Sequence, residues 1–358
     1  MMGLQSTAMI GQRHPPHKHT FFSPYGKKKP EEVSSDVIRQ VGKEKLLETL
    51  TNMLLIRNFE IRAESAYQHG KIGGFFHSYQ GEEAIATACV NIFGKNNWFI
   101  DFYRCHALPL LLEENPNILM AELYGKRTGN AMGRGGSMHL YSKRMLGGFA
   151  IVGGQLPVAA GAAFSLKYLG KNDQVAICFM GEGSVAQGMF HETMNLAALW
   201  DLPCIFIIEN NQWGMGTHVT RAIAKEPIGE SQALSYGIQG YTLDGMDYFA
   251  LHSGFSHIFS EIQKERRPIL VECICERFRG HSISDPALYR SKDELCVCMK
   301  KDPISYFAHR LEQANILDET TYKEMNQKEK NKVIQAMQFA EESPWPNVAV
   351  LEEGVYAP

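Results

Sequence analysis

A single carboxylate between two glycines is the most suggestive chemical group in the sequence. Glu182 stands in the segment GEG, and Asn211, the second of two adjacent asparagines, follows 29 positions later. Carboxylate and amide oxygens suit a hard divalent cation such as Mg2+, which can take its other ligands from water and phosphate. The two residues therefore suggest a cation that bridges a diphosphate, provided that the fold brings them together.

The elements around these two residues would bring them together. The apolar run VAICFM precedes Glu182, the run CIFIIE precedes Asn211, and the helix-like MFHETMNLAALW lies between the runs. The right-handed crossover of such a βαβ unit places the carboxyl ends of both strands at one edge of the sheet. A helix starting just after GEG would point its free N–H groups and positive dipole end at the same place.

The same alternation extends along the chain and predicts the fold class. Helix-like stretches at 156–169 and 248–264 alternate with apolar runs, as is typical of parallel strands covered by helices on both faces. We predict an α/β fold with a doubly wound, mostly parallel sheet and helical additions at 34–70 and 302–343. Residues 94–150 are irregular and rich in glycine, which favours a long surface loop.

Composition limits the classes of protein that fit. The 358 residues are 44% hydrophobic and 21% charged, with a net charge of -3, so no nucleic-acid or membrane-surface partner is indicated. We predict a basic arm (1–33), a single domain (34–345) and a tail (346–358), because the first thirty residues contain four prolines and no acid. The eight cysteines form no CxxC pair, which favours reduced thiols in a bacterial cytoplasm and leaves the mitochondrial matrix or a plastid open.

Three simpler explanations compete for the GEG and Asn-Asn segments. Either segment alone could be a tight turn. A dinucleotide site fits less well, because GEGSVAQG is not GxGxxG and the second strand ends in asparagine where a ribose-binding acid is needed. The acid, the spacing, the strand context and the twin asparagines together favour the metal and diphosphate site.

This combination resembles the thiamine-diphosphate motif, in which GDG is followed about thirty residues later by NN. Over residues 40–345 the chain is similar to the alpha subunits of the thiamine-dependent first component of 2-oxo acid dehydrogenase complexes. The resemblance is carried by the segments GGFFHSYQGEEA, DFYRCHA, GKRTGNAMGRGGSMHLY, IVGGQLPVAAGAAF, MNLAALWDLPCIFIIENNQWGMGT, DGMD and RGHSISDPALYR.

The resemblance implies thiamine diphosphate and Mg2+ as cofactors. Glu182, Asn211 and the main-chain carbonyl of Trp213 would hold the metal. Further implied cofactor contacts are the backbone of Gly183 and Ser184 and the side chains of Tyr103 and Arg104 at the diphosphate, the backbone of Ala150 and Val152 at the aminopyrimidine, and His281. The implied catalytic residues are His77 and His281, which would orient the substrate and handle protons.

The resemblance also implies the reaction and the partners. We expect oxidative decarboxylation of pyruvate and reductive acetylation of a lipoyl group, towards acetyl-CoA, because MNLAALW, ENNQWGMGT and RGHS are similar to the pyruvate enzymes. Glu182 is usual in branched-chain enzymes, so branched-chain 2-oxo acid and acetoin dehydrogenases remain alternatives. Thiamine chemistry needs a carboxylate on the pyrimidine, and the chain has no second cofactor-type domain to supply it. The implied partners are a beta subunit, as two alpha plus two beta, and a lipoyl-bearing acyltransferase.

Overall fold

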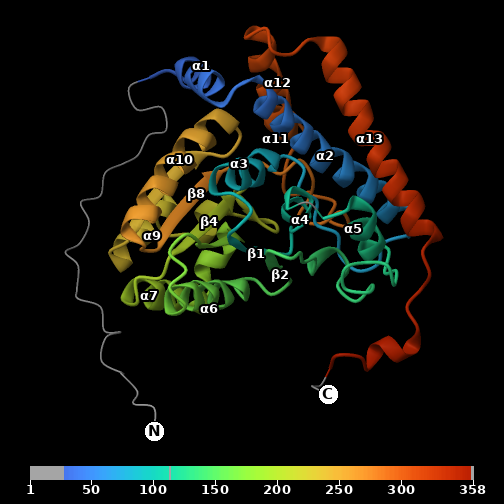
Figure 1. The fold of residues 1–358 in the computed structure, drawn as a ribbon, viewed down its shortest axis with the longest axis horizontal. Helices are drawn as coiled ribbons and strands as arrows, with labels where there is room; N and C mark the ends of the chain where they lie inside the picture. Colours follow the sequence, from blue (N-terminus) through green and yellow to red (C-terminus); the bar gives the residue numbers. More distant parts are fainter. Residues whose placement is uncertain (1–27, 113, 356–358) are drawn as a thin grey trace.

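The computed structural model describes residues 28–112 and 114–355, and its centre is a six-stranded sheet (Figure 1). The strand order is β2-β1-β3-β4-β8-β7, and every neighbouring pair is parallel. The strands are β1 (Trp98–Phe102), β2 (Met145–Phe149), β3 (Ala176–Gly181), β4 (Cys204–Asn210), β7 (Gln239–Asp244) and β8 (Ile269–Ile274). A short antiparallel pair, β5 (Trp213–Gly214) and β6 (Thr217–His218), follows β4.

Helices surround this sheet. Those before β3 are α1 (Pro30–Val41), α2 (Lys43–Gln68), α3 (Glu83–Phe93), α4 (Ala107–Leu111), α5 (Pro116–Leu123) and α6 (Gln155–Tyr168). Those after it are α7 (Gly188–Leu199), α8 (Val219–Ala222), α9 (Ile228–Tyr236), α10 (Tyr248–Glu265), α11 (Lys292–Met299), α12 (Pro303–Gln313) and α13 (Glu319–Glu342). Three 3-10 turns complete the list, η1 (Gly136–Met138), η2 (Glu182–Ala186) and η3 (Val348–Leu351).

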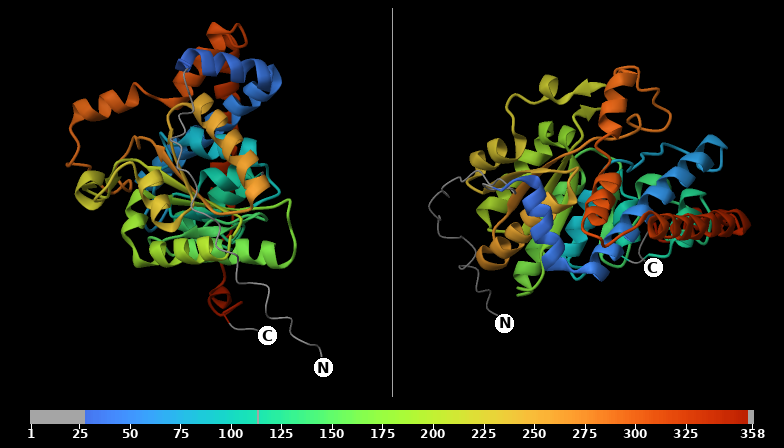
Figure 2. Two further views of the ribbon diagram at one scale, coloured as in Figure 1. Left: turned by 90° about the vertical axis from the view of Figure 1, so that its left-hand side faces the viewer. Right: turned by 90° about the horizontal axis from the view of Figure 1, so that it is seen from above.

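The sheet separates two apolar cores because its side chains alternate between the two faces. In β3, Ile177 and Phe179 belong to the larger core with α2, α3 and α10, whereas Cys178 and Met180 belong to the smaller core with α6, α7 and α9. Figures 1 and 2 show α6 and α7 along one side of the sheet and the long helices α2 and α13 beyond the other. Both faces are therefore covered, which explains why β3 and most of β4 are apolar on both sides.

Local signals in the sequence set the ends of several helices. Asp247 caps α10 by accepting a hydrogen bond from the backbone N–H of Phe249, and the helix ends at Glu265, followed by Arg266 in a left-handed backbone conformation. Asp302 caps α12 in the same way, and Pro303 occupies the first helical position, where its missing N–H costs nothing.

The predicted fold class is confirmed, and two local predictions need correction. The helix expected directly after GEG begins at Gly188, because a 3-10 turn, η2, occupies the intervening residues. The stretch 94–150 is not merely a loop, since it contributes β1 and β2 as neighbours in the sheet. The domain boundaries stay a prediction: residues 1–27 of the predicted arm lie outside the described residues, and α1 begins at Pro30, within that range.

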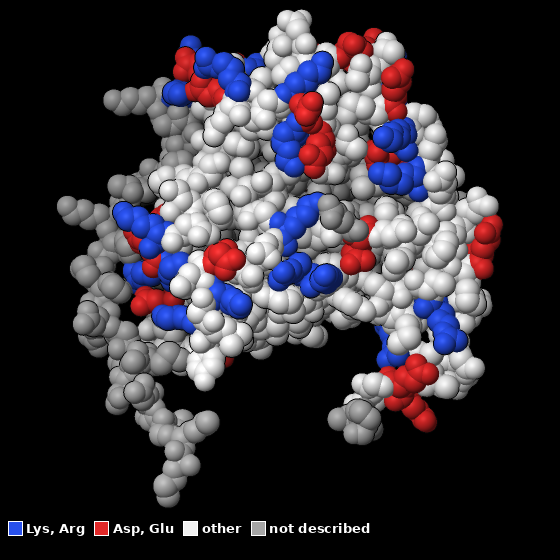
Figure 3. All heavy atoms as spheres, viewed as in Figure 1, with Lys and Arg blue, Asp and Glu red and all other residues white. Residues whose placement is uncertain are grey.

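Other expectations concern membranes, charge and cysteines. Among the described helices, none is both long enough and apolar enough to cross a membrane. On the face drawn in Figure 3, acidic and basic side chains are interspersed. All eight cysteines are free, and only Cys296 is exposed, so the reduced state of the thiols stays a prediction.

Candidate active site

The predicted metal-binding residues meet at the carboxyl edge of β3 and β4. These strands are paired in parallel with Gly181 opposite Glu209, so Glu182 and Asn211 leave the sheet side by side. Both side chains are buried. A β-carbon built on Gly214 would lie 3.7 Å from Oε1 of Glu182, which places this carboxylate against the turn that carries Trp213. Residues far apart in sequence are thus gathered at one point.

Arg277 shows that the two predicted neutral ligand atoms converge. Its Nη1 atom donates hydrogen bonds both to Oδ1 of Asn211, at 3.0 Å, and to the main-chain oxygen of Trp213. Two oxygens that accept from the same nitrogen face a common point, and Oδ1 of Asn211 also accepts from the backbone N–H of Trp213 at 3.3 Å. Together with the carboxylate of Glu182 they form an all-oxygen donor set of the kind that Mg2+ prefers, so the residues fit the implied ion.

The protonation of Glu182 reflects its burial. Desolvation raises the pKa of this carboxyl from the ordinary 4.5 to about 7, since nearby Arg277 only partly offsets the cost of burying the charge. A bound divalent cation would favour the ionised form, because it would add positive charge directly beside the carboxylate. Such a raised pKa in a carboxylate at the edge of a sheet is typical of a functional site.

The two predicted catalytic histidines lie together beside Tyr103. The ring centroids of His77 and His281 are 5.0 Å apart, and those of His77 and Tyr103 are 4.5 Å apart. Arg104 ties the cluster to the backbone by donating to the carbonyl oxygens of Ser78, at 2.5 Å, and His281, at 3.2 Å. The cluster therefore combines residues from three of the segments that carry the family resemblance, GGFFHSYQGEEA, DFYRCHA and RGHSISDPALYR.

Both imidazoles are held in the neutral form. Burial and the positive charge of Arg104 lower the pKa of His77 to about 2, with His281 as a further contributor. The same two causes lower the pKa of His281 to about 4. A neutral imidazole can donate from one ring nitrogen and accept at the other, which suits it to hydrogen bonding with a substrate at physiological pH.

The other predicted cofactor contacts line the same edge. Gly183 and Ser184 lie within η2, directly after Glu182. Ala150 and Val152 occupy the loop between β2 and α6. The adjacent Gly153 lies against Gln187, the residue after η2, and a β-carbon added to Gly153 would lie 3.4 Å from the side chain of Gln187. Val152 is 39% exposed, which leaves this side of the site open.

Sequence reasoning missed two buried residues that contact the predicted ligands. Arg277 lies only four positions before His281, and Glu82 lies within the segment GGFFHSYQGEEA. Glu82 is fully buried, accepts a hydrogen bond from the amide of Asn211 at 3.0 Å and lies 3.6 Å from Nε of Arg104. No local signal marks these two residues, because each stands beside other charged residues, Glu83 in one segment and Glu276 in the other.

The glycine-rich segment is also organised by a carboxylate. Buried Glu122 accepts hydrogen bonds from the backbone N–H groups of Ala131, Gly133, Gly135 and Gly136, at 2.7 to 3.3 Å. A side chain at Gly129 would collide with Glu122, and one at Gly133 would meet the backbone of Gly125. The glycines are therefore needed for close packing around one acid, and the segment is not a loose surface loop.

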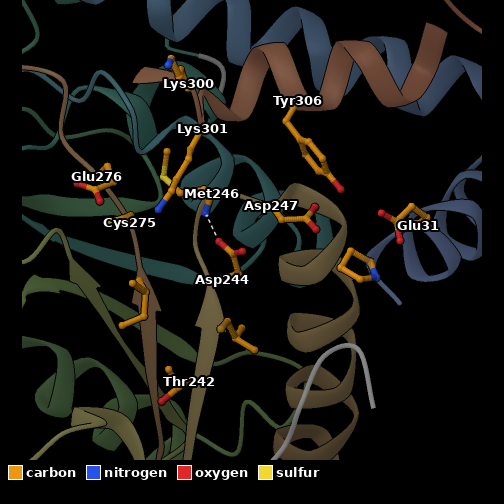
Figure 4. A pocket seen from close by; sticks show the side chains of 13 residues that line it. Glu31, Thr242, Asp244, Met246, Asp247, Cys275, Glu276, Lys300, Lys301 and Tyr306 are labelled. Atoms are coloured by element: carbon orange, nitrogen blue, oxygen red, sulfur yellow. Dashed lines mark hydrogen bonds between the residues drawn. The ribbon is translucent and has the colours of Figure 1, made fainter. Parts of the chain in front are cut away.

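A cavity of about 860 Å3 lies elsewhere on the same sheet edge, at the ends of β7 and β8 (Figure 4). Its lining includes Asp244 and Asp247, which already accept hydrogen bonds from the backbone N–H groups of Met246 and Phe249, respectively. Within 28–112 and 114–355, no group of three or more His, Cys, Asp or Glu residues could hold a metal ion. The two aspartates of the cavity are thus engaged in capping turns of the backbone.

A parallel sheet whose carboxyl edge gathers an oxygen donor set, buried arginines and neutral histidines defines a cofactor-dependent α/β enzyme. A model of the family described as dehydrogenase E1 component matches residues 51–349, and the chain belongs to this family. It is thus a component of an oxidoreductase of the thiamine-diphosphate-dependent E1 type.

Known relatives extend over most of the chain. A protein named pyruvate dehydrogenase E1 component subunit alpha, from Rickettsia bellii, is 39% identical over 316 residues, which cover 88% of this chain and 96% of the relative. A protein of the same name from Rhizobium meliloti is 38% identical over 323 residues, or 89% of this chain and 92% of the relative. The chloroplastic pyruvate dehydrogenase E1 component subunit alpha-3 from Arabidopsis thaliana is 37% identical over 324 residues, which cover 88% of this chain and 76% of the relative.

Proposed function

We propose that this chain is the alpha subunit of a pyruvate dehydrogenase E1 component, which decarboxylates pyruvate and passes the acetyl group to a lipoyl group. The observation that carries the proposal is the convergence of Asn211 and Trp213 on one point beside Glu182, a short way from the neutral pair His77 and His281. The names of the relatives favour pyruvate over a branched-chain substrate or acetoin.

In this proposal each group of residues has a separate task. Glu182, Asn211 and the carbonyl of Trp213 hold Mg2+, while Arg104 and the backbone of Gly183 and Ser184 bind the diphosphate. Thiamine diphosphate, when bound, supplies an electron sink for the carboxylate that leaves. The surrounding residues position the 2-oxo acid and exclude water.

The two histidines are proposed to act on the substrate. Their low pKa values keep them uncharged, so that they can donate a hydrogen bond to the oxygen on which negative charge develops. The buried position of His77 next to Tyr103 limits its ring to few orientations. His281 is held through its backbone, whose N–H donates to Asp285 at 2.7 Å.

Exposed apolar side chains beside the site support a beta-subunit partner. Ile151 is 73% exposed and Phe75 is 59% exposed, and both adjoin residues predicted for the site. The outer surfaces of α6 and α7 add exposed apolar side chains, namely Val158, Tyr168, Met189, Leu196 and Leu199. Apolar surface of this kind is typical of a protein interface, and a partner there could supply the carboxylate that the pyrimidine needs.

Reconstitution tests the proposal. The purified chain with saturating thiamine diphosphate and Mg2+ should show negligible decarboxylation of pyruvate, and addition of its beta subunit should restore activity and give a two-plus-two assembly by light scattering. The same assembly is then assayed with branched-chain 2-oxo acids and acetoin. Decarboxylation by the isolated chain at the rate of the mixture would refute the shared site, and a preference for another substrate would refute the assignment to pyruvate.

A further inference from the structure

Each of the two adjacent asparagines donates to a different buried glutamate. Nδ2 of Asn210 donates to Oε1 of Glu272 at 2.7 Å, on β8, whereas Nδ2 of Asn211 donates to Oε1 of Glu82 at 3.0 Å, immediately before α3. Their oxygens have one role in common and one that differs. Each Oδ1 accepts from the backbone N–H two residues later, that of Gln212 or Trp213, but Oδ1 of Asn211 also accepts from Arg277 at 3.0 Å.

The backbone around Glu82 is shaped to bring its side chain to this position. Gly81 has a φ of +104°, and a β-carbon at this residue would collide with the main-chain oxygen of Glu276. Only glycine allows this close passage, which puts the next residue, Glu82, against Asn211. The neighbouring carboxylate, Glu83, faces a different group, because it binds the guanidinium of Arg57.

An amide side chain has two unlike ends, and Glu82 fixes which end faces which way together with two donors to the oxygen, Arg277 and the backbone N–H of Trp213. Oε1 of Glu82 can accept the Nδ2 hydrogen of Asn211 but would repel its oxygen, so contact with Glu82 directs Oδ1 towards Arg277 and the carbonyl of Trp213. The second oxygen of Glu82, Oε2, is buried and has no hydrogen-bond partner within the described chain. Among the described residues, the carboxylate of Glu82 thus meets two site residues, Asn211 through a hydrogen bond at 3.0 Å and Arg104 through an ion pair at 3.6 Å.

We propose that Glu82 is a positioning residue that orients the amide of Asn211 so that its oxygen can bind the metal. Glu82 does not itself bind the ion, and its effect passes through Asn211. This inference rests on the proposed function, which makes Asn211 a metal ligand. It predicts that metal binding needs a hydrogen-bond-accepting oxygen at the position of the Glu82 carboxylate, and that this acceptor can be charged or neutral.

The test measures binding of Mn2+, as a paramagnetic substitute for Mg2+, to the alpha-beta assembly with thiamine diphosphate, by electron paramagnetic resonance. Glu82→Met keeps the length of the side chain but removes the acceptor, and it should weaken Mn2+ binding at least tenfold. Glu82→Gln keeps a carbonyl oxygen at the same reach and should stay within threefold of the unmodified protein. Glu272→Met, which removes the equivalent acceptor for Asn210, is the matched control and should leave Mn2+ affinity unchanged.

Kinetics separate positioning from a general structural defect. In Glu82→Met the Mg2+ concentration that gives half-maximal activity should rise by the same factor as the dissociation constant of Mn2+. The fall in kcat at saturating Mg2+ should be much smaller than that factor. If that variant does not fold, Glu82→Asp replaces it, because the shortened carboxylate no longer reaches Asn211 and should show the same tenfold loss.

The possible failures can be told apart with Asn211→Ala. Mn2+ binding that is insensitive to Asn211→Ala would contradict the metal site and hence the proposed function. Mn2+ binding that requires Asn211 but is unchanged in Glu82→Met, or is lost equally in Glu82→Gln, would overturn only the role given to Glu82.

Discussion

Removing the charge of Glu182 should stabilise the metal-free protein while it destroys the metal site. Desolvation raises the pKa of this carboxyl to about 7, so in the folded protein the ionised form is disfavoured. Because the folded pKa lies above the unfolded one, the protonated carboxyl contributes stability below about pH 4.5, and this contribution is lost as the pH rises through about 7. Glu182→Gln has no such loss.

The size of the effect follows from the two pKa values. The difference between 4.5 and about 7, at about 1.36 kcal/mol per pKa unit, corresponds to about 3 kcal/mol at pH 8. At pH 5 the folded protein keeps Glu182 protonated, and the loss of stability caused by its ionisation is then less than about 1 kcal/mol by the same relation. The advantage of Glu182→Gln should therefore grow by about 2 kcal/mol or more between pH 5 and pH 8.

Urea unfolding of the metal-free protein at pH 5, 6, 7 and 8 measures this difference. Glu192→Gln serves as the control, because it removes one negative charge from an exposed position on α7. With excess Mg2+ and thiamine diphosphate the order should reverse, since only the protein with Glu182 gains stability from binding. An advantage for Glu182→Gln that is equal at all four pH values would refute the reasoning from burial.

Three further substitutions test other parts of the site. Asn211→Ala should abolish Mg2+-dependent binding of thiamine diphosphate with the fold intact, and calorimetry that finds unchanged affinity would remove Asn211 from the metal site. His281→Ala should lower the rate of reductive acetylation by about 100-fold or more and cofactor affinity much less, since the ring acts on the substrate; an unchanged rate would exclude it from catalysis. Glu122→Gln should destabilise the protein by about 3 kcal/mol in urea unfolding, because an amide cannot accept all four backbone N–H groups; unchanged stability would show that these bonds contribute little.

The sequence by itself determined the class of fold and the neighbourhood of the site. Apolar runs such as CIFIIE, flanked by amphipathic stretches, have a single favourable arrangement, a parallel sheet covered on both faces. The parallel direction of a βαβ unit places the ends of both strands at one edge, and in the structure the strands that Glu182 and Asn211 follow are adjacent. These conclusions needed only local periodicity and chirality, which is why they could be reached without coordinates.

The short strands β1 and β2 could not be predicted in this way. Trp98–Phe102 contains the buried acid Asp101, and Met145–Phe149 contains two glycines, so neither has a clear strand pattern. Each is a strand because a neighbour supplies its hydrogen bonds: β1 pairs with β3, and β2 pairs with β1. Pairing between residues distant in sequence leaves little trace in the local pattern.

Only the tertiary structure decided how the site residues are held. The bridge from Arg277 to Asn211 and Trp213, and the contact from Glu82 to Asn211, each join segments that are more than sixty residues apart. Nothing in the local sequence distinguishes Glu82 from its neighbour Glu83, yet one faces the predicted metal ligand and the other binds Arg57. Which partner a buried charge meets depends on how the helices pack against the sheet, and the pKa of Glu182 depends on that same packing, because desolvation is a property of the assembled fold.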